Sequence, residues 1–375
     1  MYFLTQMFRF RDTLLAVLPA LFLLVKGEAA TQQGDWTLYK VEGRDFVTME
    51  NVADFYGMNA IHRTGEKGFE VRSGSRSLRG ELQSKEFFIN NIKFILSYPI
   101  VEQDGHLCLS RMDLTKLIEP VMRPSKIAGA DNVTTVVLDA GHGGHDNGAW
   151  SPYGNEKTFT LDVVFRLKKL LEGQGYKVVL TRSSDVFVPL YDRARTANRQ
   201  KNALFISVHF NSGGAGTGLE TYTLAPRGVP SMMADGPSVN DLVQCAGNDN
   251  DAQNMALATA THAALVVRSQ LYDRGIKRAR FVVIRETKIP AVLVEGGFLS
   301  HSFDAKIIAT PEYRQQMAAS IVLAVNNYRR AVGGGAASPV ASTQAGASEP
   351  RVRLNSDAVA PRSESSVPNA ASGKN

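Results

Sequence analysis

The stretch VVLDAGHGGHDNGA, residues 136–149, passes within a few positions from an apolar run into four glycines and two histidines. The apolar run predicts a buried strand, and the glycine-rich turn after it permits two kinds of site. Its backbone N–H groups can hold a phosphate, or His142 can bind a metal ion. The rest of the sequence decides between these two sites.

The chain has 375 residues, which fits two domains plus tails. Its hydrophobic content of 44% and charged content of 21% are ordinary for a soluble globular protein. The net charge of +6 indicates affinity for anionic surfaces, and an incidental excess of Lys and Arg explains it equally well, because the basic residues form no long run.

Residues 1–30 have the three parts of a secretory signal peptide: Arg9 and Arg11, an apolar stretch over 14–25, and small residues at its end. The alternative is an uncleaved anchor, but the apolar stretch is shorter than the roughly 20 residues that a spanning helix needs. We therefore expect an exported protein, periplasmic or associated with the cell envelope, with no stable membrane insertion after cleavage. Cys108 and Cys245 lie in different candidate domains, and we expect both to be unpaired thiols.

Three further segments follow the leader. Residues 35–124 alternate short strands, glycine turns and helical patches, which predicts a small α+β domain without catalytic chemistry. Residues 133–330 alternate strand and helix, which predicts an α/β domain with a mainly parallel sheet flanked by helices. Residues 331–375 are rich in Ser, Ala, Gly and Pro and are predicted to be disordered.

Within the second domain, apolar periodicity predicts a helix after the glycine turn, in which Phe159, Val163 and Leu167 recur at helical spacing. Further along, we predict helices over 252–272 and 311–330. FVVIR, residues 281–285, and AVLVEGG, residues 291–297, are predicted to be strands.

Polar residues interrupt the second domain where its apolar strands end. His142, His209 and Glu295 each follow such a run, and ligands of open α/β sheets gather at the carboxyl ends of strands. Glu156 opens the helix after the first strand, which places it at the same rim of the sheet. His142, Glu156 and His209 form the two-histidine, one-carboxylate set of a catalytic zinc hydrolase, and Glu295 is the candidate proton carrier.

The sequence of the glycine turn itself argues against a phosphate site. GHGGHDNG lacks the Lys-Ser/Thr ending of a Walker loop and the G-x-G-x-x-G order of a dinucleotide turn. The predicted helix also begins several residues after the glycines, so the turn does not present its N-terminal amides.

The motifs VVLDAGHGGHDNGA, LFISVHFN and PAVLVEGGFLS, together with the segment from 155 to 198, resemble the successive motifs of the zinc-dependent N-acetylmuramoyl-L-alanine amidases. They occur in that family's order and cover nearly all of 133–330. The resemblance implies Zn²⁺ held by His142, Glu156 and His209, with Glu295 as the catalytic carboxylate.

The same resemblance implies a substrate. The implied substrate is peptidoglycan, which consists of glycan strands and stem peptides. The bond cut is the amide between the lactyl group of N-acetylmuramic acid and L-alanine. The resemblance is also compatible with a protein activator, and we expect no nucleic acid partner. Residues 35–124 resemble the small N-terminal domain named after copper amine oxidases, which implies a non-catalytic module and no copper.

Departures from the family's pattern lie outside the candidate ligands. Ala140 stands where Pro is usual, and His301 stands where Asn is common. The long segment 226–254 matches the place where some members carry a helix that blocks the active site. It is rich in Gly, Pro, Asn and Asp, so we expect a loop at the groove edge and not a blocking helix.

Several polar residues are given no catalytic role. His145 is interpreted as a rim residue, Asp146 as a brace of the turn, and His262 as a packing or surface residue. Arg182, Asp185 and Arg193 form either a structural charge cluster or part of the peptide groove, and we favour the structural cluster. Two alternative functions remain: a related zinc peptidase or carboxypeptidase, and an inactive amidase fold that binds the cell wall and regulates another hydrolase.

Overall fold

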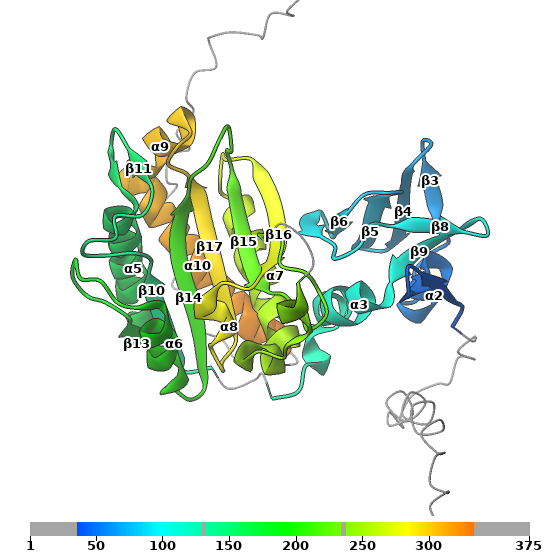
Figure 1. The fold of residues 1–375 in the computed structure, drawn as a ribbon, viewed down its shortest axis with the longest axis horizontal. Helices are drawn as coiled ribbons and strands as arrows, with labels where there is room; N and C mark the ends of the chain where they lie inside the picture. Colours follow the sequence, from blue (N-terminus) through cyan, green and yellow to red (C-terminus); the bar gives the residue numbers. More distant parts are fainter. Residues whose placement is uncertain (1–35, 130–132, 234–237, 334–375) are drawn as a thin grey trace, which may run out of the picture. The chain divides into compact units, whose positions relative to one another are not determined.

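The computed structural model describes residues 36–129, 133–233 and 238–333 (Figure 1). The predicted signal peptide and nearly all of the predicted tail lie outside these residues. Among the described helices, none is long and apolar enough to cross a membrane.

The largest sheet of the described part has eleven strands in the order β13-β10-β14-β17-β15-β16-β7-β6-β5-β4-β3. Its first six strands come from the predicted second domain. They are β10 (Thr135–Ala140), β13 (Lys177–Leu180), β14 (Ala203–Asn211), β15 (Leu219–Leu224), β16 (Asp273–Ala279) and β17 (Ala291–Phe298). The neighbours β13, β10, β14 and β17 are parallel, whereas β15 is antiparallel to β17 and parallel to β16. The sheet is therefore mixed and mainly parallel, as the sequence predicts.

The other five strands of this sheet belong to the N-terminal part. They are β3 (His62–Thr64), β4 (Gly68–Ser73), β5 (Arg76–Glu81), β6 (Glu86–Ile89) and β7 (Ile92–Ile95), and they pair antiparallel. A second antiparallel sheet contains β1 (Leu38–Val41), β2 (Arg44–Thr48), β9 (His106–Ser110) and β8 (Val101–Gln103). The helical segments here are α2 (Met49–Phe55), α3 (Arg111–Asp113), η1 (Leu114–Ile118), α4 (Glu119–Met122) and η2 (Pro124–Lys126). This is a small domain of strands and short helices.

One parallel pair, Ile276 with Phe94, joins β16 to β7. Beside this pair, the Arg278 guanidinium donates to the Asp113 carboxylate at 2.8 Å, and both side chains are buried. The two predicted domains thus meet along one sheet, and the boundaries at 124 and 133 stay a prediction.

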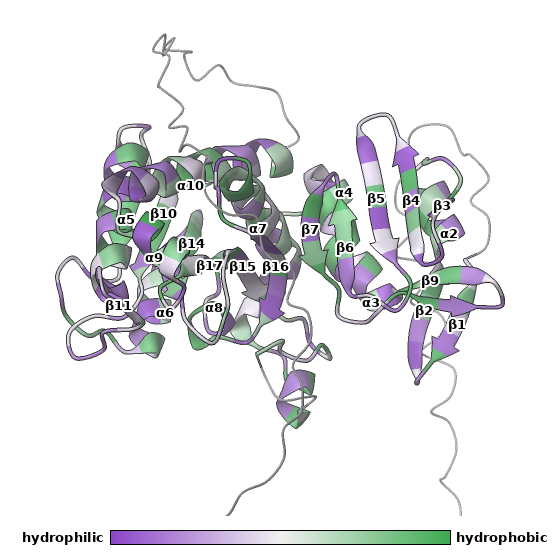
Figure 2. Ribbon diagram, turned by 90° about the horizontal axis from the view of Figure 1, so that it is seen from above, coloured by the Kyte–Doolittle hydropathy of each residue, from purple (hydrophilic) through white to green (hydrophobic). Residues whose placement is uncertain are grey.

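Helices cover both faces of the half of the sheet that the second domain contributes (Figure 2). On one face lie α5 (Glu156–Glu172), α7 (Asp251–Val266) and α10 (Pro311–Val332), and on the other lie α6 (Leu190–Asn198) and α8 (Val282–Arg285). Side chains of β14 alternate between the faces: Ile206 and Val208 join the core under the long helices, and Phe205 joins the core under the short ones. A further helix, α9 (Ser302–Ile308), follows β17.

One predicted strand is wrong. FVVIR is not a strand, because Val282–Arg285 form the short helix α8, and the strand of this region is the preceding β16. A short apolar run does not distinguish a strand from a buried helical turn. The strand β16, DRGIKRA, was missed because its charged side chains hide the pattern. The Lys277 and Arg278 side chains alternate in direction and are paired with Glu220 and Asp113.

Both cysteines are free, as predicted. The Cys108 side chain is fully buried, and burial raises the pKa of its thiol to about 11. Only about one Cys108 thiol in a thousand would be ionised at pH 8, and that thiol is inaccessible. Cys245 is half-buried.

We expect a thiol reagent at pH 8 to modify Cys245 in the native protein and Cys108 only after unfolding. Mass spectrometry of the labelled protein, before and after adding denaturant, measures both sites. The C245S variant is the control, because it should show no fast labelling. Equal labelling rates for the two native thiols would contradict this expectation.

Candidate metal centre and cleft

The candidate residues converge on the sheet face that carries α6 and α8. His209 lies on β14 with the same parity as Phe205, and Glu295 lies on β17 with the same parity as Leu293, so both point to this face. The two short helices leave the carboxyl ends of these strands uncovered. A cleft of about 560 Å³ opens there, and its lining includes His142, Glu156, His209 and Glu295.

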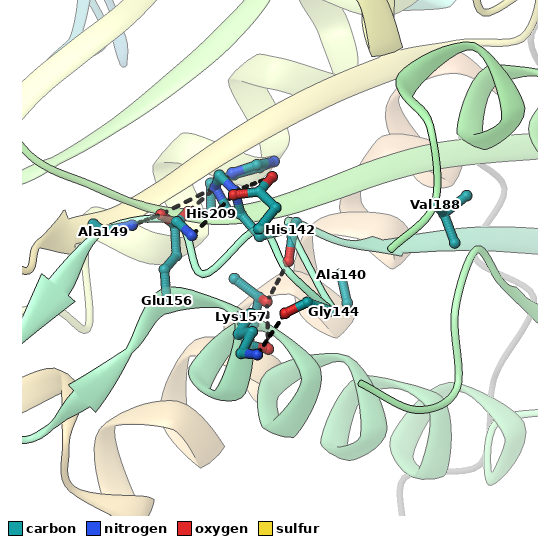
Figure 3. A network of polar contacts seen from close by, with 12 residues as sticks. Ala140, His142, Gly144, Ala149, Glu156, Lys157, Val188 and His209 are labelled. Atoms are coloured by element: carbon teal, nitrogen blue, oxygen red, sulfur yellow. Dashed lines mark hydrogen bonds and ion pairs between the residues drawn. The ribbon is translucent and has the colours of Figure 1, made fainter. Parts of the chain in front are cut away.

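One carboxylate links the two histidines (Figure 3). Glu156 Oε2 lies 3.1 Å from His142 Nε2, and Glu156 Oε1 lies 3.0 Å from His209 Nδ1. The imidazole rings are nearly perpendicular, with centroids 5.0 Å apart. One ligand atom from each of the three residues lies within 4.8 Å of the other two. The structure therefore brings together the three residues that the sequence singled out.

Backbone donors fix the Glu156 carboxylate. Glu156 is the first residue of α5, as predicted, and its oxygens accept hydrogen bonds from the Ala149 amide at 2.8 Å and the Phe210 amide at 3.0 Å. Burial alone would raise the pKa of this carboxyl, but the hydrogen bonds from the two imidazoles outweigh burial and hold the pKa well below its usual range. The group is thus an ionised carboxylate in a buried position.

Two hydrogen bonds hold His142 in place. Its backbone has a φ of +60°, and the Arg193 guanidinium donates to its carbonyl at 2.7 Å. Its Nδ1 donates to Asp146 Oδ2 at 2.9 Å, which leaves Nε2 directed at Glu156. Such a second hydrogen bond orients an imidazole that binds a metal.

This donor set fits a zinc ion. Two imidazole nitrogens and one carboxylate oxygen converge at a cleft wall, and this combination with an open fourth position is typical of catalytic zinc sites. The ionised state of Glu156 and the carboxylate behind His142 are the features that such a ligand set requires.

Glu295 stands beside this group in the sheet. In the ladder it lies opposite His209 on one side and opposite Glu220 on the other. Glu295 Oε2 is buried and has no hydrogen-bond partner within the described protein. Burial and the nearby carboxylates of Glu156 and Glu220 raise the pKa of Glu295 well above its usual value, and Lys277 opposes them. The cleft therefore holds one carboxylate without a partner.

The sequence analysis did not identify Glu220, which lies opposite Glu295 on the neighbouring strand β15. Glu220 is 2% exposed and accepts hydrogen bonds from Asn211, Tyr222 and Arg274, each at 2.7 Å, and from Lys277. Two cations thus compensate a buried carboxylate next to Glu295. A Glu inside the apolar run GLETYTL was the available signal, because a buried charge in a strand needs partners.

Two histidines to which the sequence analysis gives no catalytic role lie outside the candidate ligand set. His145 is exposed and packs its ring on Phe187, with centroids 4.3 Å apart. His262 is fully buried and bonds Thr221 and Asp273. Both observations agree with the interpretations of the sequence.

Asp146 braces the turn through the Gly148 amide, as predicted, and it also holds His142, which was not foreseen. His301 is the N-cap of α9 and accepts from the Asp304 amide. His106 Nδ1 lies 3.4 Å from Glu50 Oε1, but both side chains are about half exposed, and no third ligand joins them among the described residues.

The charge cluster is structural, as predicted. Arg182 donates to the carbonyls of Ala140 and Gly141, and Asp185 accepts from Lys157 and from the Gly144 amide. Arg193 is 2% exposed and pairs with the fully buried Asp139.

The segment 226–254 contains two short 3₁₀ turns, η3 (Val239–Leu242) and η4 (Ala246–Asn250), and then the start of α7. Arg280 holds this segment through the Pro226 and Asp241 carbonyls, each at 2.9 Å. None of its described residues lines the cleft.

The second domain of the chain is similar to known proteins. The family model described as N-acetylmuramoyl-L-alanine amidase matches residues 136–327. The N-acetylmuramoyl-L-alanine amidase AmiC of Escherichia coli O6:H1 is 29% identical over 243 residues, which cover 58% of this chain and 58% of that protein. The sporulation-specific N-acetylmuramoyl-L-alanine amidase of Bacillus subtilis is 34% identical over 185 residues, 49% of this chain and 63% of that protein.

Among solved structures, the N-acetylmuramoyl-L-alanine amidase from Clostridium difficile 630 is 31% identical. The match covers 53% of this chain and 97% of that one, with a TM-score of 0.44. The chain spans about three fifths of the length of the two curated relatives described above.

The glycines of the turn make room for the candidate ligands, and this gives a test. Gly148 has a φ of +64°, and a Cβ built on it would lie 2.5 Å from Glu156 Oε2 and 2.6 Å from His142 Cδ2. We expect Gly148→Ala to weaken zinc binding by roughly 10- to 100-fold, because it displaces two ligands. Competition with a chromogenic zinc chelator measures the affinity.

Gly175→Ala is the matched control. Gly175 has a similar φ of +85°, but its Cβ would meet nothing within 4 Å. This variant should bear the backbone strain alone and keep the zinc affinity of the unaltered protein, with folding followed by circular dichroism. Equal affinity for G148A and G175A would refute the assigned role of Gly148.

Proposed function

Because the chain belongs to the N-acetylmuramoyl-L-alanine amidase family, we propose that it hydrolyses the amide between the lactyl group of N-acetylmuramic acid and L-alanine in peptidoglycan. The observation that carries this proposal is the convergence of His142, Glu156 and His209 beside the unpartnered Glu295 in one cleft. The predicted leader, which directs the chain to the periplasm or envelope, agrees with a cell-wall substrate.

We assign the binding of zinc to His142, Glu156 and His209. When bound there, zinc would supply Lewis acidity, which polarises the amide carbonyl and lowers the pKa of water so that it becomes a nucleophile at neutral pH. Asp146 keeps His142 in the tautomer and orientation that a ligand needs, through its bond to Nδ1. The backbone amides of Ala149 and Phe210 fix the carboxylate of Glu156.

Glu295 is assigned the proton transfers. Its carboxylate lines the cleft and accepts a proton from the attacking water as the water oxygen bonds to the carbonyl carbon. It then delivers that proton to the nitrogen of L-alanine as the C–N bond breaks. The products are a lactyl carboxylic acid and a stem peptide with a free amino terminus, so atoms and protons balance.

Residues 35–124 are proposed to be a non-catalytic module. In the described part of this segment, no three His, Cys, Asp or Glu side chains gather closely enough to hold a metal ion. Its likeness to the N-terminal domain of copper amine oxidases remains a prediction. A protein activator also remains a prediction, as does any regulation by the segment 226–254.

The role of Glu295 predicts a large loss of rate. We expect Glu295→Gln to lower the release of stem peptides from purified peptidoglycan by about 10²- to 10⁴-fold, because the amide cannot carry the proton. Zinc affinity should not change, since Glu295 is outside the ligand set. Glu172→Gln, on the exposed end of α5, is the control and should keep full activity. Unchanged activity in E295Q would exclude the proposed role.

Analysis of the products separates the alternatives. An amidase releases intact stem peptides that begin with L-alanine, whereas a carboxypeptidase trims the stems from their other end. Mass spectrometry of the digested muropeptides distinguishes the two sets. Binding to the wall with no released product would support the non-catalytic regulator.

Removal of the metal gives an independent test. We expect dialysis against a strong chelator to abolish hydrolysis and stoichiometric Zn²⁺ to restore it. His209→Ala should bind zinc weakly and stay inactive after zinc is added. Metal content by plasma emission spectroscopy and activity on the same samples provide the measurement. Full activity in the metal-free protein would contradict a zinc mechanism.

A further inference from the structure

A small hairpin beside the cleft exposes two aromatic side chains. It contains β11 (Trp150–Ser151) and β12 (Gly154–Asn155), which pair antiparallel. Trp150 is 68% exposed and Tyr153 is 52% exposed. Single exposed apolar side chains are common on protein surfaces, but two aromatic rings on one short hairpin beside a cleft form a candidate binding surface.

The composition of this hairpin narrows the kind of ligand. The segment NGAWSPYGN, residues 147–155, contains no charged residue between Asp146 and Glu156. It combines two aromatic rings with amide and hydroxyl groups. These are the groups that match a neutral sugar, whose ring presents C–H groups on its face and hydroxyl groups at its edge.

The hairpin is fixed to the candidate metal site. The Ala149 amide donates to Glu156 Oε2, and the Glu156 amide donates to the Ala149 carbonyl, both at 2.8 Å (Figure 3). Ser151 Oγ donates to the Gly154 carbonyl, and Gly154 lies close to the Phe159 ring. Ala149 lines the cleft, so Trp150 follows a cleft residue directly and its backbone cannot move independently of Glu156.

The cleft and the hairpin differ in shape, and each suits a different part of the substrate. The cleft wall formed by Leu190, Phe281 and Val283 is concave and apolar, which suits a short peptide chain with small side chains. The hairpin instead presents its rings outward. A glycan strand continues in both directions from the muramic acid, so it needs an open surface and cannot enter a closed pocket.

We propose that Trp150 and Tyr153 form a subsite for the glycan strand, with the Trp150 indole stacked on the face of a pyranose ring. This assignment rests on the proposed function, because it places the sugar side of the scissile amide over the hairpin. The ligand class is a neutral N-acetylated β-linked oligosaccharide. The hairpin thus selects polymeric peptidoglycan and contributes nothing to the chemical step.

Tryptophan fluorescence tests this binding without any hydrolysis. The chain has two tryptophans, Trp36 and Trp150, so Trp36→Phe leaves Trp150 as the sole indole. Adding a glycan oligosaccharide stripped of its stem peptides should quench or shift the emission of this variant in a saturable way. A free pentapeptide stem is the comparison and should leave the emission unchanged. An emission that responds to the stem and not to the glycan overturns the proposal.

Kinetics with two substrates provides the second test. For Trp150→Ala we expect KM on polymeric peptidoglycan to rise by about tenfold with kcat unchanged, which corresponds to about 1.4 kcal/mol of binding. Hydrolysis of a monosaccharide muropeptide, which lacks the neighbouring sugars of a glycan strand, should change much less. Trp150→Phe keeps a flat ring and should recover most of the affinity.

Phe165→Ala is the control, because Phe165 is a 43% exposed aromatic residue on the outer surface of α5. It should behave as the unaltered protein on both substrates. Equal KM values for W150A and F165A on the polymer would exclude the subsite while leaving the amidase function intact. If the unaltered protein cleaves neither substrate, the proposed function itself fails, and the fluorescence titration still decides whether the hairpin binds glycan.

Discussion

The ion pair between Arg193 and Asp139 holds the ligand-bearing turn in place. Both side chains are buried, and their closest atoms are 2.8 Å apart at the end of β10. Arg193 also donates to the carbonyls of Ala140, His142 and Val188, while Asp139 accepts from Thr181 and Ser207. Because an unpaired buried charge costs about 3–5 kcal/mol, the backbone around His142 is held in the arrangement that satisfies both groups. The unusual φ of His142 follows from this constraint.

The unequal cover of the two sheet faces explains why the cleft lies where it does. The long helices α5, α7 and α10 cover one face, and the core beneath them is continuous. On the other face the smaller core under α6 and α8 stops before the carboxyl ends of β14 and β17. Side-chain alternation then directs His209, Glu295 and Glu220 into the uncovered region. The same alternation directs Lys277 towards Glu220 and Arg278 towards Asp113.

The sequence predicted those parts of the fold and site that depend on strand ends. His142, His209 and Glu295 each follow an apolar run, and a parallel sheet brings such positions to one edge whatever the details of packing. It could not predict β16, whose charges are neutralised only by residues distant in the chain. It also could not predict that Asp146 holds His142, because a turn aspartate at that spacing has several local partners available. The short helix α8 was mistaken for a strand, since four apolar residues carry no usable period.

The glycines of the opening stretch are explained by the space that the ligands occupy. A Cβ on Gly141 would lie 2.4 Å from the His209 ring, and one on Gly143 would lie 2.2 Å from the Val186 carbonyl. These positions therefore exclude side chains because imidazole and backbone atoms already fill the volume. A phosphate cradle needs glycines for a different reason, namely to expose consecutive N–H groups to an anion. Here the Gly143 amide donates to Asp146 and the Gly144 amide to Asp185, so these donors serve the protein itself. The turn is built to bring two imidazoles close to one carboxylate.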